Sequence, residues 1–279
     1  MIMARRDQAL SKTGEGDQLT LALPYWPDTD RAAPRPFLLS GLFPVVKRGT
    51  RRRLESEEVA VWGDHILRVT GQQMDQGDLD TLLELLHRAR SQETTAPVET
   101  SARELLRCMG KKTGGTQCTW LGQSIERLQN NSIQITSNGR ATYQGSLIQE
   151  FLRDEKTQAY KIVLNPRLAE MFGGGNYTRM IQEVRQALKT DLSKWLYGYV
   201  NSHRATLENP HRVKLSTLKP LTGSRATDKK FREMLRAGLE QLKEQGVLAD
   251  WEITAQGVVV LTRPERAVVP ETPRLGYGP

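Results

Sequence analysis

The order of apolar segments and turns constrains this chain more than any other feature of its sequence. From Val98 to Leu164 the pattern predicts a short strand, a helix, a turn, a second helix and a hairpin, and the same order recurs from Val213 to Thr262. This is the order of a winged helix-turn-helix unit, and two copies in one chain carry more weight than one. We therefore expect an α+β fold of tandem winged-helix domains (two winged helix-turn-helix units) with an extended N-terminal arm.

The first unit is marked by cap and turn signals. Thr100-Ser101-x-x-Glu104 is typical of a capping box at a helix N-terminus, and Gly110 is expected to end that helix. A second helix is expected from about Gln117 to Asn130 because its apolar residues fall on one face. Strands are expected over Ile133–Thr136, Ala141–Leu152 and Tyr160–Leu164, with a turn at Asn138-Gly139.

The second unit repeats these signals. A helix over Arg167–Phe172 should end at the triple glycine 173–175, and a long helical stretch is expected over 178–202, with a break near Thr190-Asp191. The strand, helices and hairpin of the second unit should follow this helical stretch. We expect a strand over Val213–Leu215, helices over Ser216–Leu221 and Asp228–Gln245, and a hairpin over 247–254 and 258–262 around Gln256-Gly257.

Four segments are predicted from these boundaries. Residues 1–36 are rich in proline and glycine and are expected to form a flexible arm. Residues 37–165 would be the first winged-helix domain, for dimerisation or contact with the DNA backbone. Residues 166–264 would be the second winged-helix domain and the main DNA reader, and 265–279 a loose tail.

Charge is distributed unevenly along the chain. The formal net charge is +8 and the pI about 9.6, which favours an anionic partner. Residues 54–100 nevertheless hold ten Asp or Glu against three Lys or Arg. They are expected to form a hairpin around Gly63-Asp64 and an amphipathic helix over Asp78–Arg90. Since acidic residues cannot face phosphate, we expect this acidic block to face solvent or another protein.

The helix over Asp228–Gln245 is the best candidate for reading DNA. Its apolar stripe leaves a basic opposite face, and a recognition helix must offer such a face to the major groove. The turn before it carries hydroxyl and guanidinium groups suited to phosphate contacts. The candidate DNA-binding residues are Ser224, Arg225, Thr227, Lys229, Lys230, Arg232 and Arg236, with Lys243 further along the same face. The alternative is that this basic face is simply exposed to solvent, on a helix that serves only to form the core.

The first unit offers a less basic face. Its candidate DNA-binding residues are Lys111, Lys112 and Thr113 on the turn, and Gln123 and Arg127 on the helix. These residues would contact phosphates weakly or would serve in dimer contacts instead. The run Lys47–Arg53 would follow phosphate or act as a flexible basic linker.

Several segments resemble known replication initiators. Residues 25–32 (Tyr-Trp-Pro-Asp-Thr-x-Arg-Ala), 171–178 (Met-Phe-Gly-Gly-Gly-Asn-Tyr-Thr), Ser202-His203-Arg204 and the turn and helix from Leu218 to Leu242 resemble the TrfA-type initiators of broad-host-range plasmids. The stretches 41–51 and 164–175 also look like the RepC iteron-binding initiators of IncQ plasmids. No single motif is diagnostic, but their shared order over about residues 18–264 is informative.

The resemblance implies a function and a set of partners. Such a protein binds directly repeated origin sequences (iterons) of double-stranded DNA, helps to melt the adjacent AT-rich DNA and recruits the host or plasmid replicative helicase. These families switch between DNA-binding monomers and inactive dimers, usually through the first winged helix, and thereby take part in plasmid copy control.

A short motif in the arm implies a further partner. Gln18-Leu19-Thr20-Leu21-Ala22-Leu23 looks like the six-residue form of the bacterial sliding-clamp-binding motif, which TrfA-type proteins carry in the same place. Leu21 and Leu23 would enter an apolar pocket while Gln18 bonds at its rim. The ending departs from the common Leu-Phe, and a chance apolar run in a linker is the alternative.

Enzymatic chemistry is not expected. Gly110-Lys111-Lys112-Thr113 lacks the glycine that a phosphate loop needs five residues earlier, where Leu105 stands. The four histidines form no His-x-His pair for a nickase, and Cys108 and Cys118 lack the spacing of a zinc site. We therefore expect no cofactor and no metal.

The segment 1–10 lacks the apolar core of a signal peptide, and no apolar run would cross a membrane. The sequence therefore predicts a cytoplasmic protein with no membrane partner. A rival to the initiator is a winged-helix transcriptional repressor that binds an operator. A third candidate, a bridging structural protein, would show no DNA sequence preference.

Overall fold

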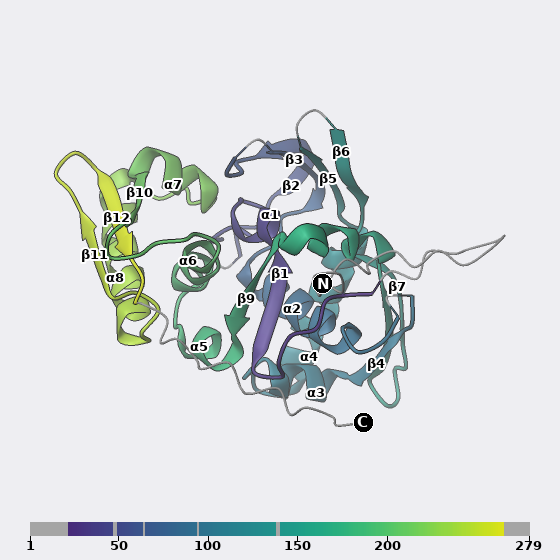
Figure 1. The fold of residues 1–279 in the computed structure, drawn as a ribbon. Helices are drawn as coiled ribbons and strands as arrows, with labels where there is room; N and C mark the ends of the chain where they lie inside the picture. Colours follow the sequence, from purple (N-terminus) through teal and green to yellow (C-terminus); the bar gives the residue numbers. More distant parts are fainter. Residues whose placement is uncertain (1–21, 47–48, 64, 94, 138–139, 265–279) are drawn as a thin grey trace, which may run out of the picture.

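The fold is α+β, with helices packed among four antiparallel sheets in the part of the chain that the structure describes (Figure 1). The computed structural model describes residues 22–46, 49–63, 65–93, 95–137 and 140–264. Asp64, the turn Asn138-Gly139 and the tail 265–279 therefore lie outside the described residues.

The first unit contains the expected strand and two helices, but its hairpin is formed by residues 148–153 and 159–164, because the expected strand over Ile133–Thr136 pairs in another sheet. It comprises β4 (Val98–Ser101), α3 (Ala102–Cys108), α4 (Gly115–Asn130), β7 (Ile148–Arg153) and β8 (Ala159–Leu164). Its strands lie in the order β4-β8-β7. Ser101 caps α3 by accepting a hydrogen bond from the Glu104 amide at 3.2 Å. After α3 the chain turns at Gly110, whose φ of 68° suits glycine.

The second unit has the same order and the same sheet arrangement. It comprises β10 (His211–Lys214), α7 (Leu215–Leu221), α8 (Asp228–Glu244), β11 (Asp250–Ile253) and β12 (Val258–Thr262). Its strands lie in the order β10-β12-β11, so in both units the first strand pairs with the last. The hairpin β11–β12 turns at Gly257, whose φ is 76°.

A four-stranded sheet is built from two strands that precede the first unit in the chain and two that are inserted between its second helix and its hairpin. It is formed by β2 (Arg53–Val59), β3 (His65–Gln72), β5 (Ser132–Ser137) and β6 (Arg140–Gly145), in that order. The β2–β3 hairpin confirms the one expected from the alternating sequence. The single strand expected over Ala141–Leu152 is wrong, because the chain bends at Gly145 and its two parts pair in different sheets. Gly145 has a φ of 153°, and an added Cβ would lie 2.8 Å from the Asn165 side chain.

Residues 22–36 are packed into the fold, although the sequence assigns them to a flexible arm. Trp26 is fully buried and stacks on Phe172, with ring centroids 5.8 Å apart. Next come β1 (Asp30–Pro34) and the short helix α1 (Arg35–Leu38). β1 is paired with a partner far along the chain, which local patterns cannot reveal.

The strand that pairs with β1 overlaps the start of residues 178–202, so the long helix expected over these residues is wrong. The chain forms β9 (Tyr177–Ile181), which pairs with β1, then α5 (Gln182–Ala187) and α6 (Asp191–Asn201). The expected break near Thr190 is confirmed, since Thr190 forms a capping box with Ser193. The helix expected over Arg167–Phe172 consists of two 3-10 turns, Pro166–Leu168 and Glu170–Gly175.

The helix of the acidic block is largely buried, so the expectation that the block faces solvent or a partner is wrong for this helix. α2 (Gln76–Ala89) lies at the centre of the fold (Figure 1). Its carboxylates at Asp78, Asp80 and Glu84 are each less than a tenth exposed. A buried charge requires a partner, and all of the partners except Arg88 come from outside α2. They are Arg127 and Arg51 for Asp78, Arg185 and Lys194 for Asp80, and Arg31 and Arg88 for Glu84.

The two units share a continuous apolar core. α6 lies between them and packs on α8 on one side and on α1 and α2 on the other (Figure 1). The Trp195 indole donates to the Ser40 carbonyl at 3.1 Å, and Trp62 packs edge-on against Tyr199. No helix among the described residues is long and apolar enough to span a bilayer.

Candidate nucleic-acid interface

α8 buries one face and exposes a basic one. Its apolar stripe, Phe231, Leu235, Leu239 and Leu242, is at most 1% exposed. Lys229, Lys230 and Arg236 are exposed on the opposite side, and Arg232 is half-buried. Lys230 is paired with Glu233 of the same face at 3.2 Å, a surface ion pair that contributes little to stability. Lys243, at the far end, is paired with Asp250 at 2.8 Å.

The start of α8 is built as a rigid, positively charged corner. Thr227 caps the helix by accepting from the Lys230 amide at 3.3 Å, and Arg225 is exposed just before it. Ser224 is half-buried, and its hydroxyl accepts from the Ala226 amide at 3.4 Å. Ser224 and Arg232 border a hollow of about 590 Å³ between this corner and the β11–β12 hairpin. The other cations that line this hollow are Lys214, Lys219 and Lys229.

In the first unit, the corresponding helix α4 is only partly available. Lys112, Thr113 and Gln123 are exposed on the turn and the helix. Lys111 is half-buried, and its ammonium lies 4.6 Å from the centroid of the Trp120 ring. This geometry is that of a cation–π contact, which holds the lysine against α4.

Arg127 is not a DNA-facing residue, contrary to the sequence-based expectation. It is 6% exposed, and its guanidinium donates to both carboxylate oxygens of Asp78 at 2.8–3.2 Å. Ser124, one turn earlier, donates to the same carboxylate at 2.6 Å. Helical spacing placed Arg127 on the polar side of α4, but that side meets α2, so Arg127 anchors the helix.

The basic run is also partly neutralised. Lys47 and Arg48 lie outside the described residues. Arg51 pairs with Asp75 and Asp78, and Arg52 pairs with Glu57 at 2.7 Å. The acidic residues that follow the run therefore neutralise two of its arginines, whereas Arg53 is exposed.

A series of adjoining hollows connects the face of α4 with that of α8. The first is bordered by Arg53, Asn130 and Gln123, and Gln123 also borders the second, beside Lys111. Val46 lines both the second and the third hollow, and Ser224 both the third and the one at α8. Each of these hollows therefore shares at least one lining residue with the next, from α4 to the start of α8.

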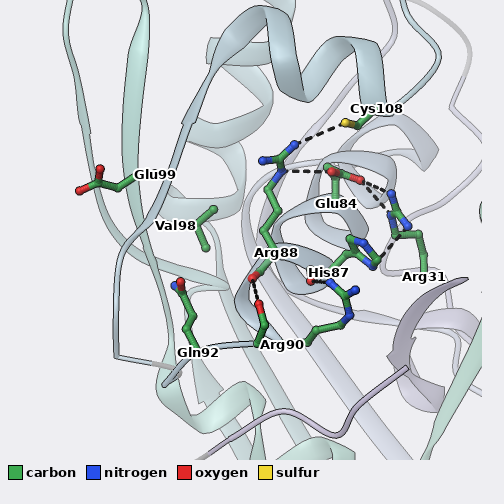
Figure 2. Close-up of a pocket in the computed structure, with 10 residues that line it drawn as sticks. Arg31, Glu84, His87, Arg88, Arg90, Gln92, Val98, Glu99 and Cys108 are labelled. Carbon is green, nitrogen blue, oxygen red and sulfur yellow. Dashed lines mark hydrogen bonds and ion pairs between the residues drawn. The ribbon is translucent and has the colours of Figure 1, made fainter. Parts of the chain in front are cut away.

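A separate polar hollow of about 430 Å³ lies beside α2 (Figure 2). Its arginines are already paired, Arg31 and Arg88 with Glu84, and Arg90 with Asp28. His87 accepts a hydrogen bond from the Trp26 indole at 3.2 Å. Burial, together with the charges of Arg31 and Arg90, lowers the pKa of His87 to about 4. These contacts fasten residues 26–31 to α2 and leave no unpaired cation here for an anionic ligand.

Of the clamp-like motif over residues 18–23, the structure describes only residues 22 and 23. Gln18, Leu19 and Leu21 lie outside the described residues. Leu23 is 5% exposed and belongs to the apolar core, so its side chain is not presented to a partner pocket in this conformation.

Within the described ranges, no group of three or more His, Cys, Asp or Glu side chains is placed to hold a metal ion. Cys108 and Cys118 are both free thiols.

Sequence comparison decides the family. A family model described as "TrfA protein" matches residues 11–259. The chain belongs to the TrfA family. A curated member, the plasmid replication initiator protein TrfA of Escherichia coli, is 26% identical over 231 residues, which make up 80% of this chain and 59% of that protein. The chain thus spans about three fifths of the length of this relative.

Structural comparison finds solved structures with a similar fold. Two crystal structures of domains 2 and 3 of RctB superpose on the chain with TM-scores of 0.58 and 0.55. Their sequence identities are 16% and 15%, and the matches cover 83% and 79% of this chain and 98% and 95% of theirs. At such identity the likeness concerns the fold alone.

Proposed function

We propose that this chain initiates plasmid replication by binding direct repeats (iterons) of double-stranded origin DNA, promoting origin opening and recruiting replication machinery. Membership of the TrfA family and the likeness to a curated plasmid replication initiator support this proposal. Under this proposal the chain acts by binding DNA and is not an enzyme.

We further propose that both strand–helix–helix–hairpin units are winged helices, in domains over residues 37–165 and 166–264. Their shared sheet order, first strand beside last, supports this, as does the exposed basic face of α8 beside the β11–β12 hairpin. The wing would lie along the DNA backbone while α8 enters the major groove.

The observation that carries the proposal is the basic face of α8 beside the β11–β12 hairpin: Arg225, Lys229 and Arg236 are exposed, and Lys229 and the half-buried Arg232 line the hollow there. In the first unit Lys112, Thr113 and Gln123 are exposed, and Gln123 lines two hollows beside α4. Because the second unit supplies more cations, we assign it the main readout and assign the first unit mostly backbone contacts.

Three further partners remain proposals. These are the sliding clamp, held by Gln18, Leu19, Leu21 and Leu23, the replicative helicase, and a second copy of the chain in a monomer–dimer switch. Clamp binding would require Leu23 to leave the core, because its side chain is buried there.

Footprinting on DNA from the parent replicon tests the function. Protection of several tandem repeats, each in the same orientation, is the expected result for an initiator. Protection of a single palindrome would support the transcriptional repressor instead. Binding without sequence preference that disappears with added salt would reject both.

A further inference from the structure

A buried ion triad connects the first unit to α5 and α6. Asp80 of α2 is 8% exposed and accepts from the Arg185 guanidinium at 2.7 Å and from the Lys194 ammonium at 2.7 Å. Arg185 is itself 2% exposed and also donates to Gln76 of α2, at 3.1 Å. Burial raises the pKa of Asp80, but the charges of Arg185 and Lys194 outweigh burial and hold it below the usual value. The carboxylate is therefore ionised between two cations.

Close contacts between α6 and α8 link the triad to α8, the proposed DNA-reading helix of the second unit. A Cβ added at Gly238 of α8 would lie 3.0 Å from the Leu196 side chain, so glycine here lets the two helices pack closely without any shift of Leu196. The Gln241 side-chain oxygen accepts from the Lys189 amide at 2.9 Å and from the Ser193 hydroxyl at 3.2 Å. α8 therefore follows any displacement of α6.

We propose that Asp80 is a positioning residue that fixes the distance and rotation between the two DNA-reading units. It thereby sets the spacing between the two segments of each repeat that they contact. The proposal rests on the proposed DNA-binding function. Its physical basis is that Asp78, on the other side of α2, holds α4 through Arg127, so α2 connects both reading helices.

Removing the charge of Asp80 should loosen this connection without unfolding either unit. Asp80→Asn keeps the shape of the side chain but removes the carboxylate that Arg185 and Lys194 share, and leaves only the more distant Asp191 to offset their charges. The two cations would repel each other and draw in water, moving α5 and α6 away from α2. The apolar contacts around Trp195 would keep the units attached.

Spacing tolerance is the readout that a general loss of stability would not change. The full chain is titrated against its repeat and against repeats with one or two base pairs inserted between the segments that the two units protect. For the wild type, an insertion should weaken binding at least tenfold. For Asp80→Asn the intact repeat should bind more weakly, and the insertion should then change binding less than threefold.

The matched control is Glu84→Gln. Glu84 lies on the same helix and is 1% exposed, but its partners are Arg31 of β1 and Arg88 of α2 itself. This variant should keep the insertion penalty of the wild type. If Asp80→Asn also kept that penalty, or if the wild type showed none, the proposal would be overturned.

A measurement without DNA separates this proposal from the proposed function. Spin labels at Glu126→Cys of α4 and Glu244→Cys of α8, in a chain with Cys108→Ser and Cys118→Ser, report the distance between the two helices by pulsed electron resonance. Both glutamates are exposed. Asp80→Asn should broaden the distance distribution, and an unchanged distribution would overturn the proposal even if the repeat is bound. Should Asp80→Asn fail to fold, Lys194→Met, which leaves the Asp80–Arg185 pair intact, is expected to broaden it less but measurably.

Discussion

Asp78 and Asp80 lie two residues apart on α2 and pair with arginines on nearly opposite sides of the helix. Asp78 binds Arg127 of α4, and Asp80 binds Arg185 of α5. Residues two positions apart on a helix are rotated by about 200° about its axis, so one side of α2 holds α4 of the first unit and the other holds α5 and α6, on which the second unit packs. The central helix therefore connects the two units through charge pairs as well as through apolar packing.

Arg127→Ala should lower the free energy of unfolding by about 3 kcal/mol, because it leaves the buried Asp78 carboxylate without its bidentate partner. Gln123→Ala, on the exposed side of the same helix, should change it by less than about 0.5 kcal/mol. Urea denaturation of both variants gives the comparison. Equal stabilities would contradict the assignment of Arg127 as an anchor.

Arg232→Ala should weaken binding to the cognate repeat by about 1–3 kcal/mol if the guanidinium contacts a base edge. If it contacts only phosphate, binding to matched and scrambled repeats should weaken evenly. Gel-shift titrations at two salt concentrations distinguish these outcomes. Lys243→Ala is the control, since that ammonium lies at the far end of α8 and is paired with Asp250. Unchanged binding to both DNAs by Arg232→Ala would exclude the residue from the interface.

Stability should fall as the pH is lowered from 6.5 towards 4. Burial lowers the pKa of His87 to about 4, and burial with the charge of His203 does the same for His211. The unfolded chain therefore binds protons at a higher pH than the folded one, and the stabilisation, complete above pH 6.5, is lost through this range. Melting temperatures across the range measure the loss. His87→Gln should flatten the dependence, and a slope identical to that of the wild type would count against His87.

Gly71→Ala should destabilise the fold by more than about 1 kcal/mol, because a non-glycine residue is strained at its φ of 132° and the new Cβ would lie 2.0 Å from the Asn131 side chain. Gly115→Ala is the matched control. Its Cβ would meet nothing within 4 Å, and alanine is favoured in a helix by about 1 kcal/mol. Thermal denaturation should thus show opposite signs for the two variants.

The clamp motif is tested by surface plasmon resonance against immobilised sliding clamp. Gln18→Ala combined with Leu21→Ala should abolish the signal, because both the rim hydrogen bond and one apolar anchor are lost. Unchanged binding would reject the motif. Leu23→Ala should in addition lower the melting temperature, since Leu23 packs in the core.

Local chemistry was readable from the sequence. The stripe of Phe231, Leu235 and Leu239, the cap at Ser101 and the Gly110 stop each depend on neighbours within a few residues, and the helices they predict are present. The order of elements in the two units follows from the same local signals.

Tertiary structure alone decided which charges are free. Arg127 and Arg236 look alike in sequence, yet one is buried against Asp78 and the other is exposed. The β1–β9 pair and the burial of Asp80 likewise depend on residues far apart in the chain. A buried carboxylate needs a cation within a few ångströms, and only the folded chain determines which cation lies there and which is left to meet DNA.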